Sequence, residues 1–236
     1  MSNTSHQDLP NQTFRLNKFL ALSLGVSRRQ ADEIIEAHQV TVNNQLARLG
    51  QIISSDDRII YRNKELSVQK HQLLILNKPT GYLCSRASQG GVPTIYKLIP
   101  DNLNHLKPVG RLDKDSSGLI LMTNDGDLAH QMTHPSFSKL KRYLATLDKP
   151  LEPLHQQMIN DYGVQLPDGN SKLTLERQHE RDNSRWIIQM HEGRNRQIRR
   201  TFQTLGYIVV KLHRTDFGDY ALGDIKRGEY RLIDIP

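Results

Sequence analysis

An arginine and an aspartate lie two residues apart in a segment that has the composition of a loop. The segment Pro108–Gly126 reads PVGRLDKDSSGLILMTNDG, in which Arg111 and Asp113 follow a glycine and precede an apolar stretch typical of a strand. A carboxylate in such a loop can serve as a nucleophile. Composition alone favours an ordinary turn with an exposed arginine, so other parts of the chain must decide.

Other catalytic motifs are missing from the sequence. It contains neither the GxxxxGK(S/T) phosphate loop nor GxGxxG after a strand, so nucleotide hydrolysis and dinucleotide binding have no support. His130 and His134 have a spacing that zinc can use, but the residues between them lack a glutamate and no third ligand is evident. Ser116 and Ser117 lack the flanking glycines of a nucleophile elbow. The single cysteine, Cys84, excludes a disulfide framework, and we expect it to be a buried, inert thiol.

A metal-dependent nuclease is a further alternative, because such an enzyme needs paired acids. Asp113 and Asp115 are close in the sequence, but their side chains would point to opposite faces if the segment were extended. Dependence on magnesium would identify this class of enzyme.

The positive charge of the chain is concentrated in one segment. The 236 residues include 32 Lys and Arg and 25 Asp and Glu, a formal net charge of +7. Residues 185–214 contain seven basic residues and one acid, so they carry +6 and the rest of the chain carries +1. Solvated basic faces are common, but this clustering favours a polyanionic partner, and nucleic acid becomes the leading class.

Length and composition limit the location of the protein and the number of its domains. The length fits one or two globular domains. No apolar run approaches the ~20 residues of a membrane-spanning helix, and the N-terminus lacks the features of a secretion signal. We therefore expect a cytoplasmic protein.

The candidate site requires elements to position it, and the first part of the chain predicts a small α+β domain over residues 14–68. Residues 1–13 are polar and without periodicity, and we expect a disordered tail there. Two helices, two short strands and a polar linker over residues 62–71 are predicted to follow. The first helix is indicated by an apolar stripe that a glycine ends: Leu16, Phe19, Leu20, Leu24 and Gly25. The second is indicated by a capping box followed by an apolar face: Ser27, Gln30, Ala31, Ile34 and Ile35. The strands are expected at 40–42 and 57–61, and Asn43 and Asn44 form a turn after the first of them.

The second part, residues 69–236, alternates strand and helix patterns. This interleaving predicts a mixed, mainly antiparallel sheet with helices packed against it, so that the whole chain belongs to the α+β class. Strands are expected at 73–76, 118–122, 143–147, 185–189 and 207–211, and helices at 126–132, 151–160 and 195–205.

Several segments together resemble a known family. The segment around Asp113 resembles the catalytic loop of pseudouridine synthases, and three further stretches agree in the family's order: NKPTG at 77–81, KRYLA at 141–145 and EGRNRQIRR at 192–200. Residues 14–66 resemble the S4 module. The chain therefore resembles bacterial rRNA pseudouridine synthases with an N-terminal S4 RNA-binding domain. One departure is Thr201, where the family usually has an apolar residue.

The resemblance implies roles for the residues of these motifs. Asp113 would be the nucleophile, Tyr143 would stack on the uracil and assist proton transfer, and Arg199 would pair with Asp113 and keep it ionised. Ile198 would form an apolar wall, and Arg111 would fill the space left by the flipped uridine. The reaction requires no metal and no diffusible cofactor, and Lys78 is expected to be structural.

The resemblance and the charge also indicate RNA contacts and partners. We expect basic side chains of both domains to bind RNA: Arg196 and Arg200, with Arg15, Lys18, Arg28 and Arg29 in the S4-like domain. A solvated helix face is the alternative for the last four. The expected partner of a monomeric enzyme is large-subunit rRNA, because more branches of the family act there. Small-subunit rRNA and a non-catalytic role in ribosome assembly are the alternatives.

Overall fold

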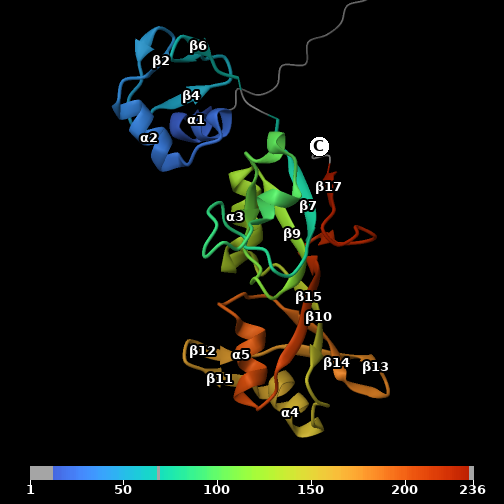
Figure 1. The fold of residues 1–236 in the computed structure, drawn as a ribbon. Helices are drawn as coiled ribbons and strands as arrows, with labels where there is room; N and C mark the ends of the chain where they lie inside the picture. The colour runs from blue at the N-terminus through green and yellow to red at the C-terminus, as the bar shows by residue number, and fades with distance from the viewer. Residues whose placement is uncertain (1–12, 68–69, 234–236) are drawn as a thin grey trace, which may run out of the picture. The chain divides into compact units, whose positions relative to one another are not determined.

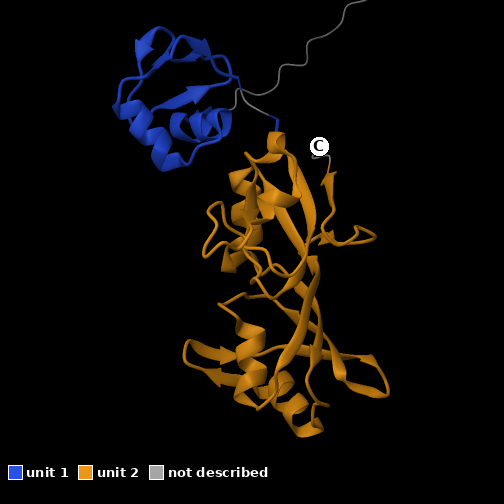
Figure 2. Ribbon diagram, in the orientation of Figure 1, with its two compact units in different colours: residues 1–71 blue, residues 72–236 orange. Residues whose placement is uncertain are grey.

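The computed structural model describes residues 13–67 and 70–233, and its contacts divide the chain into two compact units, residues 1–71 and 72–236 (Figure 2). The expected disordered tail lies outside the described residues except for Thr13, which already belongs to a strand. The boundary between the units lies between His71 and Gln72, whereas the sequence analysis placed it between residues 68 and 69.

Unit 1 consists of two helices packed together and two small sheets (Figure 1). The expected helix ends are confirmed: Gly25 ends the first helix with φ 69°, and the backbone and side chain of Ser27 exchange hydrogen bonds with those of Gln30. The elements are β1 (Thr13–Arg15), α1 (Leu16–Leu24), α2 (Arg28–Glu36), β2 (Val40–Val42), β3 (Gln45–Leu46), β4 (Ile52–Ser54), β5 (Ile59–Tyr61) and β6 (Lys64–Glu65).

The prediction of a linker over residues 62–71 is wrong for its first half. Residues 64–65 form β6, which pairs with β5 through a tight turn at Arg62 and Asn63, with φ of 47° and 64°. Such a turn between antiparallel strands needs two residues with positive φ. Leu66 packs against the core of unit 1, so the hairpin belongs to this unit.

Unit 2 is built on one large sheet with the strand order β13-β14-β10-β15-β9-β7-β17. All neighbours are antiparallel except β15 and β9, so the expected mixed, mainly antiparallel sheet is confirmed. Two short strands, β8 and β16, pair with β9 and β15. The strands are β7 (Leu73–Lys78), β8 (Lys107–Val109), β9 (Ser117–Thr123), β10 (Lys141–Leu147), β13 (Thr174–His179), β14 (Asp182–Met190), β15 (Val209–Phe217), β16 (Tyr220–Ala221) and β17 (Tyr230–Ile233).

The burial of the strands explains their sequence patterns. Every residue of β7 and β9 is buried, because one face packs against helix α3 (Gly126–Thr133) and the other against two short 3-10 turns, Ile95–Leu98 and Asp101–Leu103. A strand buried on both faces reads as a continuous apolar run. In β10, by contrast, buried and partly exposed residues alternate, because only one face contacts the core.

The other half of the sheet carries the second core of this unit. Ile198 and Phe202 of helix α5 (Gln197–Thr204) belong to the same buried hydrophobic cluster as Tyr143 and Trp186 of the sheet. The expected helix at 151–160 is instead α4 (Pro153–Gln157) followed by a π-helical turn, Met158–Tyr162. The hairpin of β11 (Val164–Leu166) and β12 (Gly169–Ser171) was not predicted.

A buried polar network joins this hairpin to α5 at Thr201. Thr201 is fully buried, and its hydroxyl donates to the carbonyl of Gln197. The Ser171 hydroxyl therefore donates to Thr201 Oγ1 at 2.7 Å and accepts from Gln197 Nε2 at 3.1 Å. The polar residue at 201 thus has a partner, Ser171, which sequence analysis did not identify.

This pairing predicts a non-additive effect on stability. We expect Thr201→Val to lower the free energy of unfolding by about 1–3 kcal/mol, because the buried Ser171 hydroxyl loses its acceptor. Adding Ser171→Ala should cost less than the sum of the two single changes, with a coupling of at least ~0.5 kcal/mol. Urea denaturation of the four proteins measures this coupling, and strict additivity would contradict it.

Candidate active site

The loop that carries Asp113 is held in place by a buried lysine, Lys78, which donates to its backbone carbonyls. Residues 110–116 connect β8 to β9, and the Ser116 N–H donates to the Asp113 carbonyl at 3.1 Å to close a turn. Lys78 at the end of β7 is fully buried and donates to the carbonyls of Asp113 (3.0 Å) and Ser116 (2.7 Å). Burial lowers the pKa of Lys78. Lys78 thus orders the loop, in line with its expected structural role.

The start of α5 contacts this loop through two arginines. Arg196 forms a bidentate pair with the Asp115 carboxylate at 3.0 and 3.1 Å, and it lies 3.5 Å from the Asp113 carboxylate. Arg199 lies 3.4 Å from the Asp115 carboxylate and also donates to the carbonyls of Asp115 and Val209. The segment 192–200 and the loop therefore meet, as the motifs led us to expect.

Two expectations about these charges are wrong in this structure. Arg199 forms its ion pair with Asp115, and the residue that pairs with Asp113 is Arg196. Asp113 and Asp115 do not point to opposite faces, because the chain turns between them and both carboxylates reach Arg196. Burial opposes ionisation of Asp115, but its hydrogen bond to Arg196 and the charges of Arg199 and Arg196 outweigh burial and lower its pKa.

The register of the sheet brings the aromatic side chain of Tyr143 to the pocket that Asp113 lines. Tyr143 on β10 lies opposite Arg214 of β15, and the parallel pairing of β15 with β9 sets Arg214 beside Gly118, two residues after the loop 110–116. Tyr143 is 7% exposed. It lines a pocket of about 680 Å³ together with Asp113 and Ile198. The pocket therefore combines a carboxylate, an aromatic ring and an apolar wall.

Arg111 and Cys84 line the same pocket but differ in exposure and in hydrogen bonding. Arg111 is exposed and has no hydrogen bond or ion pair with any residue that the structure describes. Cys84 is partly exposed and so less buried than expected, and its sulfur accepts from the Leu112 N–H. Burial raises the pKa of this thiol, which keeps it protonated and weakly reactive.

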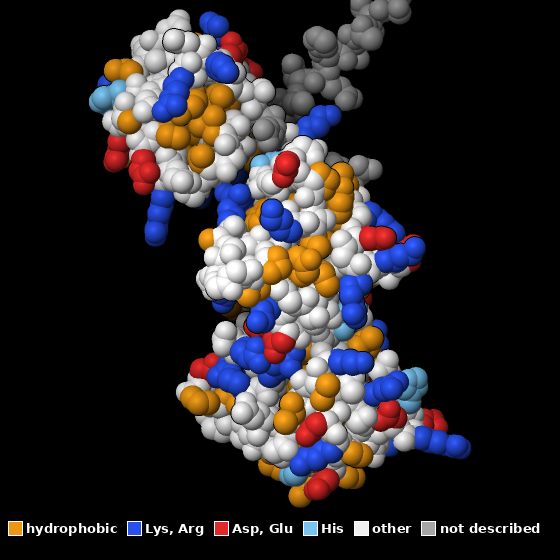
Figure 3. Space-filling model, viewed as in Figure 1, with side chains coloured by type: hydrophobic (Ala, Val, Ile, Leu, Met, Phe, Trp, Pro, Cys, Tyr) orange, Lys and Arg blue, Asp and Glu red, His pale blue; other side chains and the backbone are white. Residues whose placement is uncertain are grey.

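Most arginines of the basic segment 185–214 already pair with carboxylates of the chain, so fewer of them are available to RNA than the composition indicates. Five of the six arginines lie within 4 Å of carboxylates, and most of these acids come from outside the segment. Arg200, expected to bind RNA, pairs with Asp168 through two hydrogen bonds of 3.0 and 2.7 Å. Arg194 binds the same aspartate. The turn between β11 and β12 thus fixes the arginine segment (Figure 3 shows Lys and Arg gathered with acids near the middle of unit 2).

In unit 1, the expected RNA-binding residues lie at the starts of its helices. Arg15 precedes α1, Lys18 lies in its first turn, and Arg28 and Arg29 begin α2. Arg15, Arg28 and Arg29 are exposed, and Arg28 donates to Asn17 of α1 at 3.4 Å. Helix N-termini with exposed cations suit phosphate groups.

Several cations of the pocket were not predicted as site residues, among them Lys141 and Arg214. The position of Lys141, two residues before Tyr143 in a strand, could have indicated it. Arg214 could not be assigned, because the expected strand ended at Lys211, whereas β15 extends to Phe217.

The described residues offer neither a candidate metal site nor a candidate membrane-spanning helix. Among residues 13–67 and 70–233, no three His, Cys, Asp or Glu side chains come together in a way that could hold a metal ion. None of the helices in these same ranges is long and apolar enough to cross a membrane.

Comparison with known families identifies both units. A family model described as RNA pseudouridylate synthase matches residues 72–204, and an S4 domain model matches residues 14–59. The two matches and the site together define an RNA-modifying isomerase preceded by an RNA-binding module. The chain belongs to the family of pseudouridine synthases that carry an N-terminal S4 domain.

The similarity to several known proteins covers nearly the whole chain. The ribosomal small subunit pseudouridine synthase A of Pasteurella multocida is 38% identical over 227 residues, which cover 93% of this chain and 95% of the relative. The ribosomal large subunit pseudouridine synthase B of Bacillus subtilis is 32% identical, with coverages of 92% and 91%. A crystal structure of a pseudouridylate synthase is 34% identical and matches with a TM-score of 0.66, covering 94% of this chain and 96% of that one.

Proposed function

We propose that this chain converts a specific uridine of ribosomal RNA to pseudouridine, with Asp113 as the nucleophile. The observation that carries the proposal is the meeting of Asp113, Tyr143 and Ile198 in one pocket beside the arginines of α5. In the reaction the bond from uracil N1 to the ribose breaks, the uracil turns, and its C5 bonds to the same ribose carbon. The proton on C5 is released to water, and N1 takes up a proton from water in its place.

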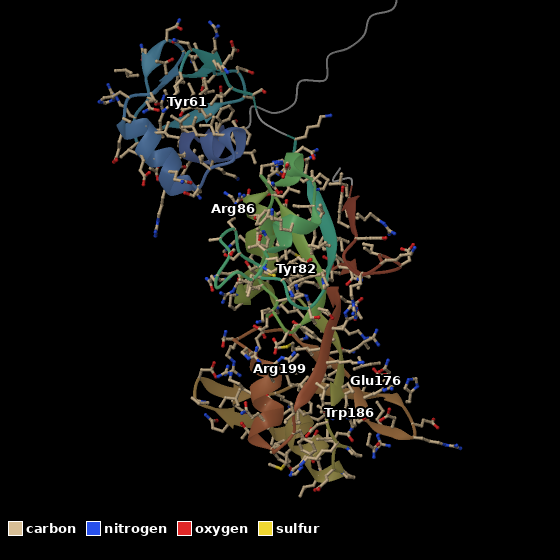
Figure 4. The ribbon with its side chains drawn as sticks, viewed as in Figure 1. Tyr61, Tyr82, Arg86, Glu176, Trp186 and Arg199 are labelled. Carbon is tan, nitrogen blue, oxygen red and sulfur yellow. The ribbon has the colours of Figure 1, made fainter. Side chains whose placement is uncertain are left out.

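Each residue of the pocket has a task in this proposal. The Asp113 carboxylate attacks the substrate, and the guanidinium of Arg196, 3.5 Å away, orients it. Tyr143 stacks on the uracil and assists proton transfer, while Ile198 forms the opposite apolar wall. Arg199 holds the loop and α5 together through Asp115 (Figure 4 labels Arg199 on α5). The pairing of Arg199 with Asp113 that the resemblance implied would need Arg199 to leave Asp115.

The target uridine must leave its helix to reach this pocket, since the glycosidic bond is inaccessible in a base-paired stack. Arg111 is exposed at the pocket and lacks partners among the described residues. Its planar guanidinium suits the space that the flipped base leaves. We therefore assign to Arg111 the role of replacing the flipped base.

For the target RNA, similarity and family size favour different subunits. The expectation from the sequence was large-subunit rRNA. The small-subunit enzyme of Pasteurella multocida is the more similar of the two full-length relatives described above, at 38% against 32% identity. We propose small-subunit rRNA as the substrate of a monomeric enzyme, with large-subunit rRNA as the competing outcome.

Mapping of pseudouridines in both rRNAs tests the proposal. Cells with and without the gene are compared, and one position in small-subunit rRNA should lose its pseudouridine. Loss of a position in large-subunit rRNA would reverse the choice of subunit. An unchanged map in both rRNAs would refute the proposed function and leave a non-catalytic role in ribosome assembly.

The division into two units predicts separate contributions to binding and chemistry. We expect deletion of residues 1–71 to weaken rRNA binding more than tenfold, because exposed cations at two helix starts are removed. The single-turnover rate at saturating RNA should stay within about threefold, because unit 2 contains its own cores and the whole pocket. Circular dichroism checks that the remaining unit is folded. A collapsed rate at unchanged affinity would contradict this division.

A further inference from the structure

Two cations in the pocket, Arg214 and Lys141, differ from the other arginines of the segment 185–214 because no carboxylate pairs with them among the described residues. Five arginines of the segment 185–214 pair with carboxylates, whereas Arg214 has no carboxylate within 4 Å among the described residues. The same holds for Lys141, which lines the pocket with it. Both cations are therefore available for an anion from outside the chain.

Arg214 is a buried guanidinium with unused donors. Its side chain is 2% exposed, and its Nε donates to the Leu119 carbonyl at 2.8 Å. Its Nη2 is buried and has no hydrogen-bond partner among the described residues. Burying a charge without a counter-charge is costly, so such a group indicates a missing partner.

The backbone holds Arg214 in place. A Cβ on Gly118, whose φ is 105°, would lie 2.2 Å from the Arg214 carbonyl oxygen, so only glycine permits this approach of β9 to β15. Gly118 lies two residues after the loop 110–116 in the sequence. The guanidinium is thereby fixed relative to Asp113.

Lys141 shares an aromatic ring with Arg214. The Lys141 Nζ lies 5.1 Å and the Arg214 Cζ 4.8 Å from the centre of the Phe217 ring. Nζ donates to the carbonyls of Lys139 (3.3 Å) and His191 (3.1 Å), which leaves a third proton for another acceptor. Burial and, after it, the charge of Arg214 lower the pKa of Lys141, and the opposing charge of Glu192 does not outweigh them.

The strand register relates this pair to the site of the base. Lys141 lies opposite Phe217, Tyr143 lies opposite Arg214, and all four residues line the pocket. Two residues along a strand span about 7 Å, which is comparable to the separation of a base from its own phosphate. We propose that Lys141 and Arg214 bind a phosphodiester group next to the target uridine while Tyr143 holds its base.

This assignment rests on the proposed function, and the charge of the site favours phosphate over the other groups of RNA. Uracil carbonyls and ribose hydroxyls are neutral and would leave two neighbouring cations uncompensated. A phosphodiester carries one negative charge and two free oxygens, which match the fork of a guanidinium and the third proton of an ammonium. The bound phosphate would position the ribose for Asp113.

The test removes charge from each partner of the proposed contact, first from a phosphate of the RNA and then from Lys141 of the enzyme. The RNA is a fragment that spans the uridine identified by mapping, with a neutral methylphosphonate in place of its 5′ or its 3′ phosphate. We expect one of the two replacements to weaken binding to the unaltered enzyme about tenfold. Lys141→Met should bind the normal fragment about tenfold more weakly and no longer distinguish it from that modified fragment.

A matched control and a second variant complete the design. Lys149 lies over the ring of Tyr207 at 4.9 Å, outside the pocket, so Lys149→Met removes a lysine from an aromatic ring without touching the site. It should respond to both modified fragments as the unaltered enzyme does. Arg214→Lys retains the charge and avoids an empty buried site, and it should also lose most of the discrimination.

The outcomes separate this inference from the proposed function. If the unaltered enzyme binds both modified fragments as tightly as the normal one, the phosphate site does not exist. Undiminished discrimination by Lys141→Met would overturn it as well. Failure of the unaltered enzyme to release tritium from the normal fragment labelled at uridine C5 would instead refute the proposed function.

Discussion

Replacement of Asp113 by asparagine should abolish pseudouridine formation and leave RNA affinity nearly unchanged. Asparagine keeps the size and hydrogen-bonding capacity of the side chain but cannot act as an anionic nucleophile. We expect the rate of tritium release from RNA labelled at uridine C5 to fall by at least about 10³-fold. Because a negative charge is removed from an RNA-binding pocket, binding could change only toward slightly higher affinity.

Affinity and melting temperature distinguish this result from other roles of Asp113. The carbonyl of Asp113, and not its carboxylate, accepts from Lys78 and Ser116, so the turn should survive the substitution. We expect a melting temperature within a few degrees of that of the unaltered enzyme. A large fall in melting temperature would indicate a structural aspartate, and unaltered tritium release would remove Asp113 from the mechanism.

The second large effect is expected at Arg199. Its guanidinium contacts the Asp115 carboxylate, the carbonyls of Asp115 and Val209, and the Ser116 hydroxyl, and so joins α5, β15 and the loop that carries Asp113. A lysine cannot reproduce this fork of donors. We expect Arg199→Lys to reduce kcat about 100-fold with less than a threefold change in RNA affinity.

The control for Arg199 is another arginine in an ion pair. Arg231 pairs with Asp224 at 2.6 Å near the C-terminal strand, and neither residue lines the pocket. Arg231→Lys should leave kcat within about twofold of that of the unaltered enzyme. Equal effects of the two substitutions, or a loss at Arg199 confined to affinity, would contradict a positioning role for Arg199.

The periodic elements could be predicted from the sequence because their signals are local. The signals of the capping box at Ser27 and of the helix at 195–205 each lie within a few residues, and both elements are found where they were expected. The strand runs of β7 and β9 are continuous because both faces are buried, which a short apolar stretch indicates directly. The large sheet follows from the alternation of such segments.

The charge pairs of the site could not be predicted, because they join residues far apart in the sequence. Arg196 meets Asp115 from 81 residues away, and Arg200 meets Asp168, so a count over residues 185–214 overstated the free positive charge. The turn that presents Asp168 did carry a local signal, the sequence Pro-Asp-Gly at 167–169. The position of Asp115 depended on whether its segment was extended or turned, and extension was the wrong assumption.

Complementation of cells that lack the gene tests the central claim most directly. The measured quantity is the fraction of pseudouridine at the rRNA position that mapping identifies, in cells that express the unaltered protein or Asp113→Asn at equal levels. We expect the unaltered protein to restore nearly complete modification and Asp113→Asn to restore none. Restoration by Asp113→Asn, or by neither protein, would contradict the proposal that this chain isomerises an rRNA uridine through Asp113.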